Sequence, residues 1–217
     1  MTTSVAARIR GLYAIADTGY LDEARLVSAV AQALRGGARV VQYRDKSHDR
    51  STRERQARAL RELCASHQAC FIVNDDAELA RSVGADGLHL GRDDAAIDAA
   101  RALLPEGAII GVSCYNDLAR AEAAVARGAD YVAFGSFYPS RTKPRALRAS
   151  LDLLRAARAR LPVPLVAIGG ITPENGAALI AAGADALAVI SGVFDQPDVE
   201  ATARRYVELF KKSGRSN

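Results

Sequence analysis

The 217-residue chain has no tryptophan and one methionine, and aromatic residues make up only 6% of it. A nucleic-acid surface needs basic residues interleaved with exposed aromatics, which this composition does not favour. No apolar run approaches the roughly 18–20 residues that span a bilayer. We therefore expect neither a nucleic acid nor a membrane as a partner.

Cysteine is also scarce. Cys64, Cys70 and Cys114 are odd in number and none forms a CxxC pair, which argues against a disulfide framework or a zinc site. We expect thiols of the core or loops. Because the first ten residues lack the apolar segment of a signal peptide, the sequence predicts a cytoplasmic protein.

The charge excess is small. The net charge is +4, which is compatible with anionic small molecules as ligands. The basic stretch over residues 44–61 is interrupted by acidic residues and is typical of the solvated face of a helix. Lysine occurs only four times, at Lys46, Lys143, Lys211 and Lys212.

Four segments repeat one pattern, Gly-Ala-Asp or Gly-Ala-Arg followed by a short apolar run. They begin at Gly37, Gly84, Gly128 and Gly183, which are 47, 44 and 55 residues apart. Glycine suits the left-handed residue that ends a helix, and the apolar run suits a buried strand. Since one strand–helix unit takes roughly 20–30 residues, each interval holds two units.

The remaining elements are expected between these repeats. We predict further strands over residues 11–16, 69–74, 108–113 and 162–168. We predict helices over residues 22–34, 118–127, 174–182 and 199–212, with Thr172 and Pro173 as cap and first-turn residue of the third. Residues 213–217 are expected to be a frayed tail.

These units predict an α/β fold, a single (βα)8 TIM-barrel domain over residues 1–217. An open doubly wound sheet is the alternative. Eight regular units, the fourfold repeat and the lack of GxGxxG after the first strand favour closure. In such barrels the active site lies beyond the C-terminal ends of the strands.

Those strand ends carry a set of candidate ligands. Gln42, Arg44 and Lys46 alternate onto one side of the second strand, and an amide, a guanidinium and an ammonium suit a diphosphate. Asp75 and Asp94 follow the third and fourth strands. Carboxylates at neighbouring strand ends favour a cation between them, and magnesium is typical of carboxylates combined with substrate phosphates. Asp76 and Asp93 are better interpreted as helix caps.

The later strand ends predict anion binding as well. No histidine follows Ser113 in the chain, so a hydrogen-bonding role suits Ser113 better than a nucleophilic one. Lys143 lies with several hydroxyl residues in the longest loop of this edge. Glycine-rich turns at Gly170 and Ser191 predict a backbone phosphate site. His89 is expected to be packed and hydrogen-bonded rather than catalytic.

Taken together, these residues resemble the thiamine-phosphate synthase family over residues 11–195. The matching segments are VQYRDK (41–46), IVNDD (72–76), GADGLHLGRDD (84–94), GVS (111–113), PSRTKP (139–144), AIGGI (167–171) and AVISG (188–192). The resemblance implies a transferase that condenses 4-amino-2-methyl-5-hydroxymethylpyrimidine diphosphate with a thiazole phosphate, or its carboxylate. In the family, the C–O bond breaks first and the thiazole nitrogen attacks the resulting methylene cation.

The resemblance also implies roles for the site residues. The pyrimidine diphosphate would contact Gln42, Arg44, Lys46 and Asn74. One magnesium ion would be held by Asp75 and Asp94. The diphosphate region would contact Ser113 and Lys143, which with Arg44 and Lys46 are the expected catalytic residues. The thiazole would lie near Ser140 and Thr142, and its phosphate against the backbone of Gly170, Ile190 and Ser191.

Three residues depart from the family pattern: Arg92 stands where glutamine is frequent, Ser136 where proline is frequent, and Ser140 where threonine is frequent. Arg92 adds a charge near the pyrimidine site. Two alternatives stay open. A thiazole tautomerase shares the phosphate end but relies on a histidine after the fifth strand, where this chain has Tyr115. A non-catalytic phospho-ligand binder would have no need of the two aspartates. The oligomeric state is open, with a homo-oligomer possible.

Overall fold

The structure is a computed structural model that describes residues 4–46, 49–91, 95–139 and 148–214. Eight parallel strands form a closed barrel in chain order, each hydrogen-bonded to the next and β8 to β1. The strands are β1 (Gly11–Asp17), β2 (Val40–Arg44), β3 (Cys70–Asn74), β4 (Gly87–Leu90), β5 (Ile109–Tyr115), β6 (Tyr131–Gly135), β7 (Leu165–Ile168) and β8 (Ala186–Val189). The predicted single TIM barrel is therefore confirmed.

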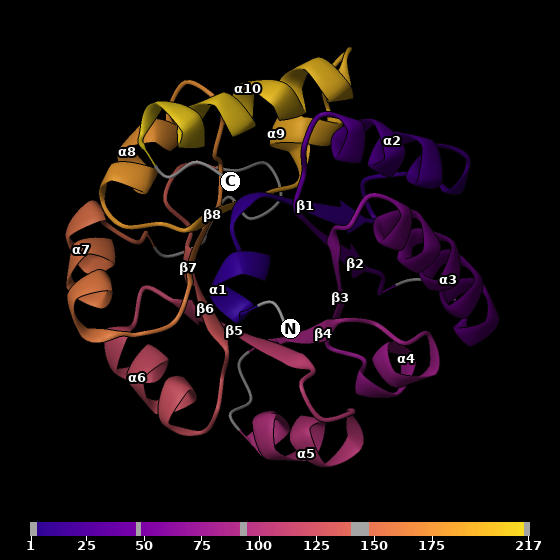
Figure 1. Ribbon diagram of the computed structural model, residues 1–217, viewed down its shortest axis with the longest axis horizontal. Helices are drawn as coiled ribbons and strands as arrows, with labels where there is room; N and C mark the ends of the chain where they lie inside the picture. The colour runs from indigo at the N-terminus through magenta and orange to yellow at the C-terminus, as the bar shows by residue number, and fades with distance from the viewer. Residues whose placement is uncertain (1–3, 47–48, 92–94, 140–147, 215–217) are drawn as a thin grey trace.

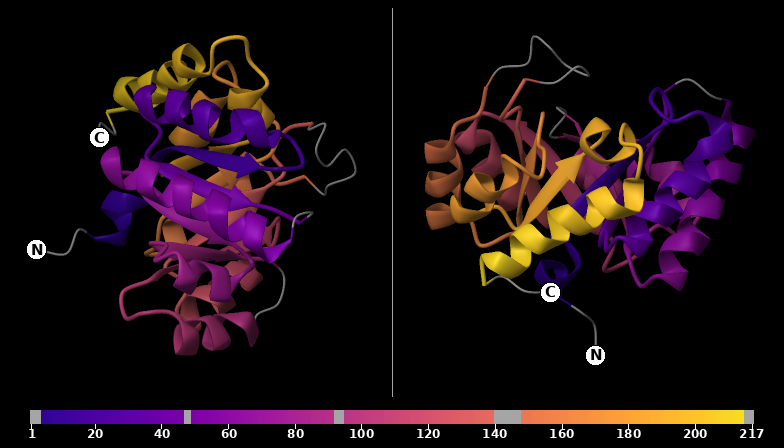
Figure 2. Two further views of the ribbon diagram at one scale, coloured as in Figure 1. Left: turned by 90° about the vertical axis from the view of Figure 1, so that its right-hand side faces the viewer. Right: turned by 90° about the horizontal axis from the view of Figure 1, so that it is seen from above.

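Helices surround the barrel as a ring, with α1 across its N-terminal mouth (Figure 1). The helices are α1 (Val5–Arg8), α2 (Glu23–Arg35), α3 (Arg50–Ser66), α4 (Ala77–Ser82), α5 (Ala95–Leu103), α6 (Leu118–Ala126), α7 (Leu151–Arg160), α8 (Gly176–Ala181), α9 (Ser191–Phe194) and α10 (Val199–Lys212). Figure 2 shows α1 at the end from which the strands start. Over the described ranges, every helix is too short or too polar to cross a bilayer.

The repeat found in the sequence has a clear structural role. Gly37, Gly84, Gly128 and Gly183 all have positive φ, as expected for residues that end helices. In three copies the aspartate that follows accepts a hydrogen bond from the first residues of the preceding strand. These bonds join Phe71 N to Asp86, Ile110 N to Asp130 and Leu165 N to Asp185 at 2.7–2.8 Å.

The apolar core has two parts. The larger lies between the outer face of the strands and the helices, and it contains Cys64 and Cys114. The smaller fills the barrel interior, where Val5 of α1 packs against it. Gly111 makes room there for a large ring, because a Cβ on it would lie 1.9 Å from Cζ of Tyr131. The three cysteines are buried, as core thiols should be.

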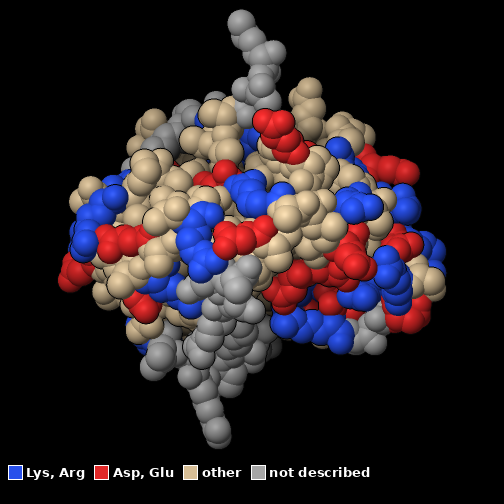
Figure 3. Space-filling model, turned by 90° about the horizontal axis from the view of Figure 1, so that it is seen from below, with Lys and Arg blue, Asp and Glu red and all other residues tan. Residues whose placement is uncertain are grey.

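On the outside, charges of both signs are mixed. The face in Figure 3 shows acidic and basic side chains next to one another over its described residues. Ion pairs on the outer helices include those between Arg35 and Glu200 and between Arg160 and Glu122. Exposed pairs of this kind contribute little to stability, roughly 0–1 kcal/mol each.

Candidate active site at the C-terminal rim

The ends of β1 and β2 hold an ion pair that the sequence reasoning missed. Arg44 Nη1 lies 2.5 Å from Oδ2 of Asp17, and the two residues face each other across the strands. Asp17 is only 6% exposed, and its other oxygen accepts the backbone N–H of Gly19. This buried carboxylate fixes the guanidinium at the rim. The available signal for this pair in the sequence was the acidic residue Asp17 at the end of the first strand.

Gln42 lies deeper, inside the barrel, and is buried. Its Nε2 donates a 2.7 Å hydrogen bond to the hydroxyl of Tyr13 on β1. Arg44, two residues on, reaches the rim beside Asp17. The structure thus places the amide below the guanidinium on the same strand.

A chain of hydrogen bonds crosses the barrel interior from Gln42. It runs through the hydroxyls of Tyr13 and Tyr131 to Nδ1 of His89, and from Nε2 of His89 to Oγ of Ser113. Each of these contacts is 2.7–2.9 Å long. The sequence reasoning did not identify Tyr13 or Tyr131. The one available signal was that both tyrosines lie at inward-facing positions of predicted strands.

Burial sets the protonation of this chain. It lowers the pKa of His89 to about 4, which the charge of Asp75 opposes weakly, so the imidazole is neutral at pH 7. Burial also raises the pKa of Tyr13 and Tyr131 above its ordinary value, so both hydroxyls keep their protons. The predicted packed, hydrogen-bonded position of His89 is confirmed by these contacts.

The end of β3 brings together a lysine and a carboxylate. Lys46 Nζ lies 3.4 Å from Oδ2 of Asp75, and both side chains are about half exposed at 61% and 47%. Asp75 has a φ of 61°, an uncommon value for a residue with a side chain, and its N–H donates to the carbonyl of His89. Backbone held in this region is frequent at functional sites. Asn74 ends the same strand and is half-buried.

Asp75 has the donor chemistry that a magnesium site requires, a hard carboxylate oxygen open to ligands at the rim. Its expected partner, Asp94, lies outside the described residues. Within the described ranges there is no group of three or more metal-binding side chains. Magnesium is compatible with so few protein ligands, because it usually keeps waters and binds substrate phosphates.

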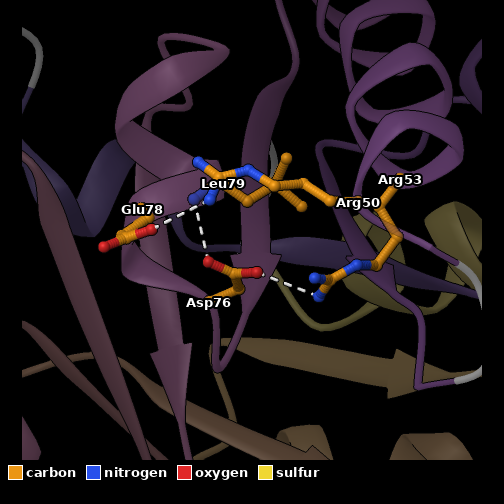
Figure 4. A pocket seen from close by; sticks show the side chains of 5 residues that line it. All are labelled: Arg50, Arg53, Asp76, Glu78 and Leu79. Atoms are coloured by element: carbon orange, nitrogen blue, oxygen red, sulfur yellow. Dashed lines mark hydrogen bonds and ion pairs between the residues drawn. The ribbon is translucent and has the colours of Figure 1, made fainter.

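Asp76 is a structural neighbour rather than a ligand. Its Oδ1 accepts the N–H of Leu79 and so caps α4, as predicted, while Oδ2 pairs with Arg53 at 2.9 Å. Figure 4 shows these groups with Arg50 and Glu78 around a small cavity of about 120 Å³. Arg50 pairs there with Glu78 at 3.3 Å. The charges of this cavity already neutralise one another. The predicted cap at Asp93 lies outside the described residues.

The loop after β7 presents a close-packed glycine pair. A Cβ on Gly170 would lie 2.3 Å from the carbonyl oxygen of Pro139, and φ there is +63°. Tyr138 N–H donates to the carbonyl of Gly169, which ties the loops after β6 and β7 together. Asn175 closes the turn, since its Nδ2 donates to the Gly170 carbonyl and its Oδ1 accepts from Thr172 N–H.

The cap predicted at Thr172 and Pro173 is wrong. Helix α8 begins at Gly176 after Asn175, because the preceding residues form the turn that Asn175 closes. After β8, Ile190 precedes the short helix α9, whose first residue is Ser191. Gly170 and Ser191 follow adjacent strands, so their loops are neighbours at the rim.

The structure therefore brings several predicted residues to one end of the barrel. Gln42, Arg44, Lys46, Asn74, Asp75, Ser113, Gly170, Ile190 and Ser191 all lie at or just below the C-terminal ends of the strands. Asp94, Ser140, Thr142 and Lys143 lie outside the described residues, as does Arg92. Ser136 is described, and its Oγ donates to the carbonyl of Tyr138.

Comparisons with known proteins show which proteins this chain is similar to. The family model for thiamine monophosphate synthase matches residues 12–193. The chain is 55% identical to a thiamine-phosphate synthase of Nitrosococcus oceani over 206 residues, 95% of both chains. It is 56% identical to one from Acidithiobacillus ferrooxidans, covering 93% of this chain and 94% of the other. A solved thiamine phosphate pyrophosphorylase of Pyrococcus furiosus superposes with a TM-score of 0.85 at 34% identity, covering 94% and 97%.

Proposed function

Because this chain belongs to the thiamine-phosphate synthase family, we propose that its rim joins the pyrimidine diphosphate to the thiazole phosphate and releases diphosphate and thiamine phosphate. Its activity is that of a transferase acting on small molecules. The observation that carries the assignment of the site is the group of Arg44, Lys46 and Asp75 at the ends of β2 and β3. Two cationic groups and a carboxylate there suit a diphosphate and its metal ion.

In the proposed reaction the bond between the pyrimidine methylene carbon and the diphosphate oxygen breaks. The electron pair leaves with the diphosphate, whose growing charge Arg44 and Lys46 stabilise, together with Lys143. The thiazole nitrogen then donates its lone pair to the methylene carbon and forms the new C–N bond. This reaction needs charge stabilisation and alignment, and no acid–base pair has to be poised for it.

Magnesium, held by Asp75 and Asp94 with the substrate, would neutralise the leaving diphosphate. Ser113 would donate to the diphosphate region, and Gln42 and Asn74 would hold the pyrimidine half. The thiazole half would lie toward Ser140 and Thr142. Its phosphate would bind the backbone at Gly170, Ile190 and Ser191, where the loop glycines and the start of α9 would offer N–H groups to an anion.

Two other functions are distinguished by the same assay. A thiazole tautomerase would isomerise the thiazole carboxylate with no pyrimidine substrate present. A non-catalytic phospho-ligand binder would bind either substrate and yield no product. The cations Arg44 and Lys46 at the end of β2, with Lys46 beside Asp75, favour the synthase, because neither alternative has a diphosphate leaving group to stabilise.

The test mixes the purified protein with both substrates in magnesium and, separately, in excess chelator. We expect thiamine phosphate and diphosphate in equal amounts with magnesium and loss of product with chelator. Absence of product with magnesium present would refute the synthase assignment. Product that is unaffected by chelator would refute only the metal.

The metal role of Asp75 is tested with the variant Asp75→Asn, compared with the same substitution at an aspartate far from the rim. We expect Asp75→Asn to cut turnover by orders of magnitude and to raise the magnesium concentration that gives half-maximal rate. Asparagine tolerates the positive φ at this position, so the fold should persist. The matched control is Asp152→Asn on the exposed surface of α7, which should change neither quantity.

A further inference from the structure

The hydrogen-bond chain inside the barrel ends on two residues of the proposed site, Gln42 and Ser113. We propose that Tyr13, Tyr131 and His89 are positioning residues that give this chain a single direction and thereby make Ser113 a hydrogen-bond donor toward the substrate. This proposal rests on the proposed function for the identity of the ligand. The direction of the chain itself is a property of the free protein.

The direction follows from the donors along the chain. Gln42 Nε2 can only donate, so the Tyr13 hydroxyl accepts there and gives its one proton to Tyr131. The Tyr131 hydroxyl then donates to Nδ1 of His89. A neutral imidazole that accepts at Nδ1 carries its proton on Nε2.

The last step fixes Ser113. His89 Nε2–H donates to Ser113 Oγ at 2.9 Å, so the serine proton is not used within the chain. That proton is available for an acceptor at the rim. At the other end, Oε1 of Gln42 is left as an acceptor. One end of the chain therefore offers a donor and the other an acceptor.

The reverse direction is the alternative. If the Gln42 amide were turned over, Tyr13 would donate to Oε1, Tyr131 to Tyr13, and Nδ1–H of His89 to Tyr131. Ser113 would then spend its proton on Nε2 of His89 and face the substrate with lone pairs only. A diphosphate has only acceptor oxygens, so this direction opposes its binding, whereas the first direction assists it.

The surroundings hold the chain in place. Tyr13 and Tyr131 are fully buried, and the Tyr131 ring occupies the space that Gly111 leaves. His89 stacks on the Tyr131 ring with centroids 5.6 Å apart. Every hydroxyl and ring nitrogen of the three positioning residues has a partner in the chain, which is the condition for a stable buried network.

The test begins with the histidine tautomer, measured by ¹⁵N NMR on protein labelled at histidine. The protein has three histidines, so comparison with His89→Gln identifies which resonances belong to His89. We expect a protonated Nε2 and an unprotonated Nδ1 in the wild-type protein without substrate. A protonated Nδ1 would overturn the proposal. If the tautomer is as expected but no thiamine phosphate is made, the direction stands and the proposed function fails.

Kinetics then test whether the direction matters. Tyr131→Phe removes the hydroxyl that joins Tyr13 to His89. We expect mixed tautomers at His89 and a loss of about tenfold in kcat/KM. The control is Tyr43→Phe, which deletes another buried hydroxyl, one that hydrogen-bonds to Gln56 and Asp45 and takes no part in the hydrogen-bond chain inside the barrel. It should lower stability similarly while leaving the His89 spectrum and kcat/KM unchanged within about twofold. Equal effects of the two variants on kcat/KM would overturn the positioning role.

Discussion

The two ends of the barrel use charged residues in different ways. At the N-terminal end, Asp86, Asp130 and Asp185 each accept a strand N–H and also pair with an arginine at 2.5–2.7 Å. The arginines are Arg8, Arg101 and Arg158. Each carboxylate therefore satisfies backbone groups and joins one strand–helix unit to the next.

At the C-terminal rim one charged pair is instead open to solvent. Arg44 is held by Asp17, and Lys46 lies near Asp75 with both side chains open to solvent. The backbone differs as well. The N-terminal end assigns positive φ mainly to glycine, with Gln68 as an exception, whereas Asp75 and Tyr115 adopt it at the rim. One end is arranged for stability and the other keeps strained, partly exposed groups for ligands.

This contrast predicts that substitutions at the rim change activity far more than stability. The largest effect is expected for Lys46→Ala, which removes a cation from the leaving diphosphate. We expect kcat/KM to fall roughly 100- to 1,000-fold. The melting temperature should stay nearly unchanged, because the pair with Asp75 is exposed.

The control for this variant is Lys211→Ala on α10, which removes another lysine from an ion pair. It should leave kcat/KM unchanged. A Lys46→Ala enzyme with wild-type turnover would contradict the assigned role of the rim.

Substitutions at the N-terminal end should do the opposite. Asp130→Ala leaves the N–H of Ile110 without its partner and removes the ion pair of Arg101, which keeps its hydrogen bonds to the carbonyls of Ala108 and Gly128. We expect the free energy of unfolding to fall by about 2–3 kcal/mol, measured by urea denaturation, with kcat/KM within twofold of wild type. Asp130→Asn should recover part of the loss. A variant that unfolds normally but has lost activity would erase the distinction between the two ends.

The stability of the fold is expected to depend on pH through His89, which lies in the barrel interior between the two ends. His89 has a pKa of about 4 in the fold against 6.5 when unfolded. Below pH 6.5 the unfolded chain therefore binds a proton that the folded chain does not, and stability falls as pH falls. Between pH 7.5 and pH 5 the loss from this group is about 2 kcal/mol.

The measurement is urea denaturation in metal-free buffer at both pH values. Tyr131, Tyr13 and Ser113 contact His89 or its chain, and Asp75 is the charge that acts on it. His89→Gln should remove this part of the pH dependence, whereas His67→Gln, at an exposed helix end, should keep it. The prediction would be contradicted if the free energy of unfolding changed equally between the two pH values in the wild type and in both variants.

The smallest effect is expected for an ion pair that belongs to neither end. Arg155→Ala breaks an exposed pair with Asp152 on α7. We expect a change of less than about 0.5 kcal/mol in the free energy of unfolding and none in turnover. A larger loss would show that exposed pairs also help to hold the barrel together.

The barrel and most of its elements could be predicted from the sequence. Hydrophobic period and capping residues are local signals, so the helix over residues 199–212 was predicted with the bounds that α10 has. The four repeat glycines were predicted in their left-handed role. Short helices such as α1 and α9 were not predicted, because a single turn has too little local stability and depends on its tertiary packing.

The strand ends likewise pointed to the rim residues, because alternation along a strand fixes which side chains share a face. The partners of these side chains could not be predicted in the same way. Tyr13 and Tyr131 are 118 residues apart in the chain and meet because the barrel closes around them. The pairing of Asp17 with Arg44 depends on the register of β1 against β2. Such contacts depend on packing and register, which no local sequence pattern records.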